Sequence, residues 1–300
     1  MRVHHFKTWP RFLILGFFLI LLPGLAIGAD LGGLPRNWNP RNLAEIEPPR
    51  SDTLTFAVLG DTKGGHETLG RLFRQMNQEG DLAFAMYLGD MVDRGTVANY
   101  RVFFREVWRN LRIPLLGVIG NHELNGNGGS LYRNIWGPRY YSFQIKGNYF
   151  IVLDDAAAED LNPSQMHWLE RELQRAQGSR TRLVFLHVPL FDPRGGRHHH
   201  CLPPVLATQL WELFNKYRVA HIFAGHIHGY FTGSWGGVPF TITAGAGAPL
   251  YGADPEHFFY HYLKVSLTRG KLRIQVRPLR ATPRSAAALP QPQVWAAGVP

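Results

Sequence analysis

Cysteine is almost absent from this chain, because Cys201 is its only cysteine among 300 residues. An intramolecular disulfide is therefore excluded, and so is a thiolate nucleophile or metal cluster that needs several cysteines. With 45% hydrophobic residues, a chain of this length can bury a sizeable core without a covalent cross-link.

Other common signatures are missing too. The chain has no Gly-x-Ser-x-Gly stretch of serine hydrolases and no internal repeat. The glycine-rich run "TAGAGAPLY" at 243–251 is not surrounded by a βαβ pattern, so it predicts a tight loop near a site edge instead of a nucleotide fingerprint. The chemistry must therefore come from other side chains.

Acidic residues are outnumbered, with 22 Asp and Glu against 32 Lys and Arg, and the formal net charge is +10. Such an excess is compatible with nucleic acid, anionic lipid or phosphorylated substrates, and charge alone does not choose among them. Nucleic acid is an alternative that we do not favour. No feature of the sequence indicates a protein partner.

The first 28 residues contain no acid and predict an export segment. Arg2, Lys7 and Arg11 precede the apolar run "FLILGFFLILLPGLAIGAD", and small residues occur at Ala26 and Gly28. This order is typical of a secretory signal peptide. The alternative is an uncleaved anchor through residues 12–28, because about 17 apolar residues approach the length that spans a membrane. Either interpretation predicts an exported protein, which is periplasmic, secreted or membrane-anchored.

Composition divides the rest of the chain into three segments. Residues 29–52, rich in Pro, Asn and Arg, predict an irregular lead-in, and residues 53–280 predict one globular domain. Residues 281–300 are rich in Ala and Pro and predict a disordered tail.

Within the domain, helical and strand patterns alternate. Apolar residues recur with helical spacing over 66–78, 96–111 and 204–217, and Asn162-Pro163 predicts the start of another helix. The patterns at 140–153 and 261–277 predict hairpins. Alternation followed by hairpins predicts an α/β domain in which two sheets pack together with helices outside.

Five apolar runs end in side chains that can bind metals. Alone, each has an ordinary explanation, since Gly-Asp often forms a turn and a single His after a strand is usually structural. In open α/β sheets, however, ligands bind where the carboxyl ends of strands converge. Glycine before four of these residues permits sharp turns and close backbone approach. The residues at the five ends are Asp61, Asp90, Asn121 with His122, His187, and His226 with His228.

This ordered set resembles the calcineurin-like metallophosphoesterases, a family that includes the purple acid phosphatases. The matching motifs are Asp61, "GDMVDRG" at 89–95, "GNHE" at 120–123, His187 and "GHIH" at 225–228. The resemblance spans about residues 54–277. It implies a four-layer α-β-β-α sandwich of two mixed β-sheets flanked by helices, with a two-metal site at one edge.

The resemblance also implies the ligands. Asp90 would bridge two divalent or trivalent ions, and Asp61 with His228 would complete one site. The ligands of the other site would be Asn121, His187 and His226. Carboxylate, amide and imidazole ligands suit Mn, Fe or Zn, and the sequence does not choose among these metals.

The same resemblance implies hydrolysis of phosphate esters by a metal-bound hydroxide, without a covalent intermediate. His122 would protonate the leaving group or hold the phosphate, Asp93 would orient His122, and Arg94 would contact the phosphate. Phosphatases and phosphodiesterases share these motifs. The alternatives are a non-catalytic binding protein with a weakened metal site, and an exported nuclease.

Lys63 departs from the family pattern, which has a histidine at this position. At 4 Å and an effective dielectric constant of 20, an ammonium repels each unit of metal charge by about 4 kcal/mol. Lys63 therefore cannot act as a metal ligand while charged. Three alternatives remain: Lys63 turns outward to bind substrate phosphate, His66 replaces the missing ligand, or this side of the site holds no metal.

Overall fold

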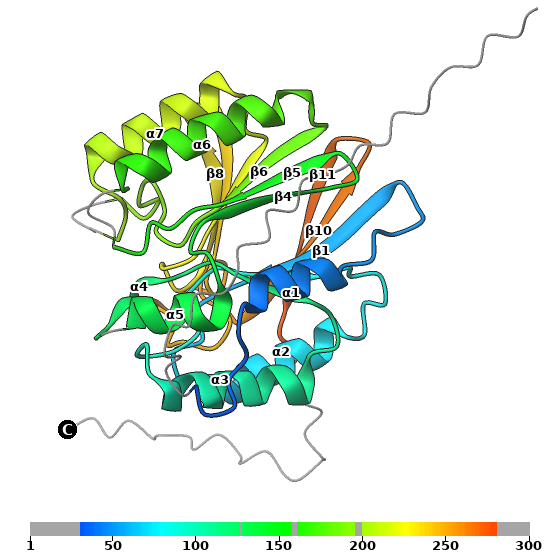
Figure 1. Cartoon of the computed structure of the whole chain (residues 1–300), viewed down its shortest axis with the longest axis vertical. Coiled ribbons are helices and arrows are strands. Elements are labelled where there is room, and N and C mark those ends of the chain that lie inside the picture. Colours follow the sequence, from blue (N-terminus) through cyan, green and yellow to red (C-terminus); the bar gives the residue numbers. More distant parts are fainter. Residues whose placement is uncertain (1–30, 127, 158–160, 196–199, 281–300) are drawn as a thin grey trace, which may run out of the picture. The chain divides into compact units, whose positions relative to one another are not determined.

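The computed structural model describes residues 31–280, except residues 127, 158–160 and 196–199 (Figure 1). The predicted leader at 1–28 and tail at 281–300 lie outside this range, and both stay predictions. Sequencing the amino terminus of the protein from its host would test the leader. In the part of the chain that is described, no helix combines the length and the apolar character needed to cross a bilayer.

The described chain contains seven α-helices, one 3-10 turn and eleven strands. The helices are α1 (Trp38–Glu45), α2 (His66–Met76), α3 (Val97–Asn110), α4 (Asn121–Leu124), α5 (Gly128–Trp136), α6 (Pro163–Arg175) and α7 (Pro204–Lys216), with the 3-10 turn at Ala176–Gly178. The strands are β1 (Thr53–Leu59), β2 (Ala85–Tyr87), β3 (Leu115–Gly117), β4 (Tyr141–Ile145), β5 (Asn148–Val152), β6 (Thr181–Phe185), β7 (His221–Ala224), β8 (Tyr230–Trp235), β9 (Val238–Thr243), β10 (His261–Thr268) and β11 (Lys271–Pro278).

Two mixed sheets pack face to face between helical layers, which confirms the predicted four-layer α/β sandwich. The first sheet has the order β11-β10-β1-β2-β3, and the second has the order β4-β5-β6-β7-β9-β8. Helices α2, α3 and α5 cover the outer face of the first sheet, and α6 and α7 cover the second (Figure 1). The central strands of both sheets are parallel, so their carboxyl ends lie at a common edge.

Both faces of the central strands are buried. Along β1, Phe56 and Val58 enter the core between the sheets, while Ala57 and Leu59 face the helices, as the two-residue period of a strand requires. Phe56 stacks on Phe84 of the same sheet, with ring centroids 5.0 Å apart. An apolar face on each side explains why these strands read as continuous apolar runs.

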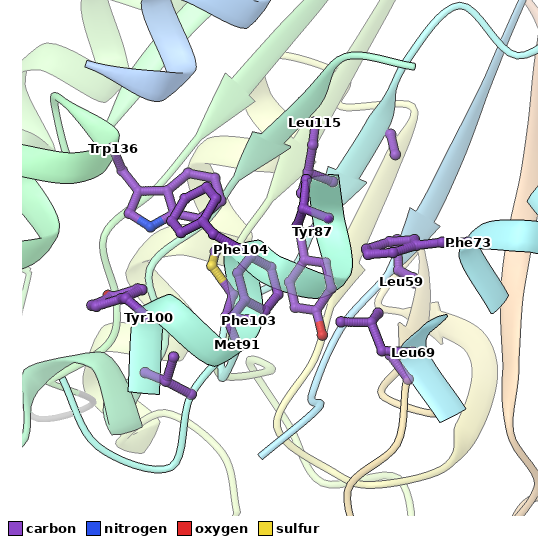
Figure 2. Close-up of a cluster of buried hydrophobic side chains, with 14 of the residues drawn as sticks. Leu59, Leu69, Phe73, Tyr87, Met91, Tyr100, Phe103, Phe104, Leu115 and Trp136 are labelled. Atoms are coloured by element: carbon purple, nitrogen blue, oxygen red, sulfur yellow. The ribbon is translucent and has the colours of Figure 1, made fainter. Parts of the chain in front are cut away.

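The layer between the first sheet and its helices is rich in aromatic residues. Tyr87 of β2 meets Phe103 of α3 edge to face, with ring centroids 5.4 Å apart. Phe104 and Trp136 lie beside them, so α3 and α5 share one apolar cluster (Figure 2). This packing fixes the helices behind the strands whose ends carry the predicted ligands.

The predicted helix starts are found where the sequence placed them. The side chain of Asn162 accepts a hydrogen bond from Ser164 N at 2.9 Å, and Pro163 opens α6. Thr96 caps α3 in the same way, by accepting from Asn99 N. These caps satisfy amide groups that have no partner inside the helix.

Helix α1 lies within the segment 29–52, and this differs from the irregular structure expected there. The Asn39 side chain exchanges two hydrogen bonds with the backbone of Gly117, at 2.7 and 3.0 Å. Asn42 accepts a third from Leu115 N at 3.0 Å. The two asparagines thus pair with β3, the edge strand of the first sheet, in place of another strand. The spacing of apolar residues within 29–52 does not indicate this helix, because α1 is stabilised by contacts with residues far along the chain.

Glu79 forms a polar cluster on the first sheet that should make stability depend on pH. Its carboxylate accepts hydrogen bonds from Tyr262, Lys264 and Arg277 at 2.7 to 2.9 Å. Partial burial opposes ionisation, but these bonds outweigh it and lower the pKa of Glu79 to about 2. The resulting stabilisation is complete above the ordinary pKa near 4.5 and is lost as pH falls toward 2.

We therefore expect Glu79→Gln to lower the free energy of unfolding by about 1–2 kcal/mol at pH 7. The difference from the wild type should shrink as pH falls from 4.5 to 2, in urea titrations at several pH values. An equal loss at every pH would show that the charge of Glu79 is not responsible.

Candidate metal centre

The predicted ligands come together where strand ends from both sheets meet. Asp61 follows β1 and Asp90 follows β2, and the amide of Asp61 donates to Gly89 O at 3.1 Å. Across the two sheets, Ala246 N donates to Gly60 O at 2.9 Å and Ala248 N to Asp61 O at 3.0 Å. The run 243–251 is therefore a tight loop at the site edge, as its sequence predicts.

A first group of donor atoms surrounds the ring of His187. Its Nε2 lies 2.9 Å from Oδ1 of Asn121, 3.2 Å from Nδ1 of His226 and 3.4 Å from Oδ1 of Asp90. These atoms come from the ends of four strands, and they converge as ligands of one ion would. The resemblance assigns the same four residues to one metal.

A second group contains Asp61, Asp90 and His228, whose ligand atoms lie within 4.8 Å of one another. Nε2 of His228 is 3.6 Å from Oδ1 of Asp61 and is buried without a hydrogen-bond partner. A buried nitrogen lone pair without a donor fits a cation at this position. Each group therefore presents donor atoms of the kinds that bind metal ions.

Two of the imidazole rings are oriented by hydrogen bonds for metal binding. Nδ1 of His187 donates to Leu88 O at 2.7 Å, and Nδ1 of His228 donates to Pro249 O at 2.6 Å. Each bond orients Nε2 toward the site. Burial lowers the pKa of His228 to about 4, so this ring is neutral. Burial also acts against a charge on His187, but the carboxylate of Asp90 outweighs it and raises the pKa of His187.

The backbone is strained at the ligands. Asp61, Asp90 and His226 have φ values of 67°, 52° and 70°, in the left-handed region that residues other than glycine rarely adopt. Such conformations persist only where the surroundings enforce them, and they occur often at functional sites. Gly89 shows the close approach predicted for the glycines, because a Cβ there would lie 2.7 Å from the His187 ring and 2.8 Å from the backbone of Gly120.

Two buried acids support the ligand loops, and no role for either is predicted from the sequence. Glu123 accepts hydrogen bonds from the amides of Gly120, Asp90 and Val92, at 2.7, 2.8 and 3.2 Å. Burial and the charge of Asp90 raise the pKa of Glu123 to about 7. In the sequence, only its place in "GNHE" marks Glu123 as a candidate functional residue. That motif does not indicate which amides Glu123 binds.

Asp155 supports the second sheet in the same way. It accepts from the amides of His187 and Val188, both at 2.8 Å. Burial raises its pKa to about 7. The sequence shows only that Asp155 ends the apolar run of β5, which is the same signal that the predicted ligands carry.

His122 lies at the open side of the first group. Its amide donates to Oδ1 of Asp90 at 3.0 Å, and its Nδ1 donates to the carbonyl oxygen of Asp93 at 2.7 Å. The carboxylate of Asp93 is farther away, at 3.8 Å. Asp93 therefore orients the ring chiefly through its backbone. Arg94 is exposed, and no side-chain ion pair or hydrogen bond of Arg94 is found within the described residues.

Lys63 points into the site, and this differs from the outward orientation that was the first alternative. Its Nζ lies 3.0 Å from Oδ2 of Asp90, and its side chain is 12% exposed. Burial lowers the pKa of Lys63, but Asp90 and Asp61 outweigh that effect and raise it, so the ammonium stays charged. His66 opens α2, its charged neighbours are Arg105 and Glu106 of α3, and it belongs to neither ligand group.

Aromatic residues form the rim beside the second group. The ring of Tyr251 stacks on His228, with centroids 4.2 Å apart, and His200 lies beside Tyr251 and His226. A cavity of about 550 Å³ adjoins this rim, and Arg194 lines it together with Tyr251. Space for the organic part of a substrate is therefore present next to the ligands.

Comparison with known proteins agrees with this geometry. A model of the calcineurin-like phosphoesterase family matches residues 54–230. This chain belongs to that family. The match begins at β1 and ends after "GHIH", so it includes every predicted ligand.

Relatives of known name include phosphatases and a phosphodiesterase. The chain is 28% identical over 153 residues to the serine/threonine-protein phosphatase CPPED1 of Rattus norvegicus, a match that covers 46% of this chain and 49% of the relative. It is 28% identical over 193 residues to a probable cyclic nucleotide phosphodiesterase of Rhodopseudomonas palustris, covering 60% of this chain and 69% of the relative. The chain thus spans about half the length of the rat phosphatase.

Among solved structures, a dimetal phosphatase from Danio rerio superposes with a TM-score of 0.61 at 16% identity, covering 78% of this chain and 98% of that one. At this identity the likeness shows a shared fold. The four-layer sandwich is therefore the fold of the calcineurin-like phosphoesterases.

Proposed function

We propose that this protein is a metal-dependent hydrolase of phosphate esters. The observation that carries the proposal is the convergence of Asp90, Asn121 and His226 around the His187 ring, at 2.9 to 3.4 Å from its Nε2, beside His122. Family membership supports the same reaction class. The named relatives include a phosphatase and a phosphodiesterase, so both ester types are candidate substrates.

The ligand residues prepare the site for a cation. Asn121 contributes a neutral oxygen, His187 and His226 contribute nitrogens, and Asp90 contributes the negative charge. A bound Mn, Fe or Zn ion would polarise the phosphoryl group and make an attacking water more acidic. Glu123 and Asp155 fix the loops that hold these ligands, so little rearrangement is needed on binding.

His122 is placed to supply a proton to the leaving group. Its Nδ1 proton is engaged by the carbonyl oxygen of Asp93, and this leaves Nε2 for the substrate. The ring is partly exposed, so a substrate can approach Nε2, and a proton carried there can pass to the departing oxygen.

The test is an assay of metal-free protein supplied with Mn²⁺, Zn²⁺ or Fe²⁺, with an aryl phosphate monoester and an aryl phosphate diester as substrates. We expect hydrolysis of at least one ester with at least one metal, and none with chelator present. Inactivity with every metal and both esters would contradict the proposal and favour the binding-protein alternative.

Replacement of His122 tests the proton donor. We expect His122→Ala to lower kcat about 10²-fold to 10³-fold for an ester with a poor leaving group, because general acid catalysis contributes that much. The loss should be much smaller for nitrophenyl esters, whose leaving group needs no proton. His167→Ala, at a histidine on α6 outside both ligand groups, is the matched control. Equal losses for both leaving groups would contradict this role for His122.

A further inference from the structure

Lys63 pairs with the carboxylate oxygen of Asp90 that the first ligand group leaves for the second. Oδ1 of Asp90 faces the first group, 3.0 Å from the amide of His122 and 3.4 Å from Nε2 of His187. Oδ2 lies 3.0 Å from Nζ of Lys63. An ion in the second group would therefore compete with an ammonium for this carboxylate oxygen.

The position of Lys63 is built into the turn after β1. The amides of Thr62 and Lys63 both donate to Asp90 O, at 2.9 and 3.3 Å, and the hydroxyl of Thr62 bonds that of Tyr87. Lys63 itself has a φ of 33°, and Gly65 is so close to Gly247 that no side chain fits between them. The turn that carries Lys63 is thus fixed by backbone contacts, and from it the side chain reaches Asp90.

The charges in the site accommodate one divalent ion more easily than two. Asp61 and Asp90 are the two carboxylates of the ligand groups. Lys63 and one divalent ion already bring three positive charges against these two negative ones. A second divalent ion would add two more, with the ammonium adjacent and shielded from solvent, where repulsion is strong.

We propose that this protein binds a single catalytic metal ion, at Asp90, Asn121, His187 and His226, and that the Lys63 ammonium replaces the second ion. The inference rests on the proposed function, since it concerns the same site, and it departs from the two-metal site that the family resemblance implies. Lys63 then supplies the fixed positive charge next to Asp61 and His228, where it can bind a phosphoryl oxygen of the substrate.

The test is metal stoichiometry, measured without any substrate. Metal-free protein is titrated with Zn²⁺ by calorimetry, and retained zinc is counted by elemental analysis after desalting. We expect one ion per chain in the wild type and in Lys63→Arg, and two in Lys63→His. Lys63→His replaces the ammonium by a neutral nitrogen ligand. Nε2 of His228, which has no hydrogen-bond partner, is available as a second nitrogen ligand for the same ion. The second ion of Lys63→His should bind on the order of 10²-fold more tightly than any second ion of the wild type.

Further variants separate charge from folding. Lys63→Met removes the ammonium without adding a ligand and should strengthen binding of a second ion by a smaller factor, which keeps the test valid if Lys63→His does not fold. Lys216→His adds a histidine at an exposed lysine of α7 and should keep one ion. EPR spectra with Mn²⁺ should show an isolated ion in the wild type and a coupled pair in Lys63→His.

Two tightly bound ions in the wild type, or a single ion in both Lys63→His and Lys63→Met, would overturn the inference. Binding of a second ion by Lys216→His would overturn it as well, because a histidine added anywhere on the protein would then be enough to bind another ion. If the wild type binds one ion and Lys63→His binds two, but neither hydrolyses any ester, the proposed function is wrong and the inference on metal number stands. If the wild type binds two ions and hydrolyses an ester, the proposed function stands and the inference is wrong.

Discussion

Asp90→Asn is expected to abolish both metal retention and hydrolysis. Asp90 faces both ligand groups and is the only carboxylate of the first, and it also pairs with Lys63. An amide keeps the shape and can still accept the bond from the amide of His122. It cannot neutralise either a bound cation or the ammonium. We expect kcat/KM to fall on the order of 10³-fold or more, which is about 4 kcal/mol in the barrier.

Elemental analysis and ester hydrolysis would be measured on the same preparations of wild type and Asp90→Asn. Asp52→Asn is the control, because Asp52 is an exposed carboxylate that pairs with Arg269 and lies at the opposite end of β1 from Asp61. It should retain full metal content and activity. Normal zinc binding by Asp90→Asn would show that the carboxylate is not a ligand and would refute the assignment of the site.

Glu123→Gln is expected to weaken the fold and the site together. The carboxylate of Glu123 accepts from three buried amides, and a glutamine has only one acceptor oxygen. At least one amide would then face an NH₂ group with no acceptor. We expect the free energy of unfolding to fall by about 2–4 kcal/mol. Metal affinity should fall about 10-fold to 100-fold, as it does when groups that orient ligands are removed.

Urea unfolding and zinc titration would measure the two effects of Glu123→Gln separately. Glu67→Gln, at an exposed position in the first turn of α2, should change unfolding by less than about 0.5 kcal/mol. If Glu123→Gln lost stability but bound zinc normally, Glu123 would support the fold without positioning the ligands.

The ligand convergence could be predicted from the sequence because it follows from a topological rule. Strands that are buried on both faces read as apolar runs, and parallel strands place their carboxyl ends at one edge. Asp61, Asp90, Asn121 and His187 each follow such a run. The helices α2, α3, α6 and α7 could be predicted for a related reason, since each turns a regular apolar stripe toward a sheet.

The features that the sequence analysis missed depend on contacts between distant residues. Asn39 in α1 acts by pairing with Gly117, 78 positions away, and no local pattern encodes that distance. Glu123 and Asp155 act through backbone amides, and most of these amides belong to distant loops. The direction of Lys63 depends on a left-handed turn and on the nearby Asp90 backbone. The hairpin of β8 and β9, by contrast, turns at Gly236 and Gly237, a local signal that the sequence analysis did not use.

The ligands are divided between the two halves of the chain. Asp61, Asp90 and Asn121 are oxygen donors that follow strands of the first sheet, whereas the imidazoles of His187 and His226 follow strands of the second. During synthesis, the three oxygen ligands are therefore made first, and the imidazoles follow only after β6 and β7. The first ligand group is thus complete only when both sheets have formed and docked, so metal binding at this group reports the docking of the two sheets.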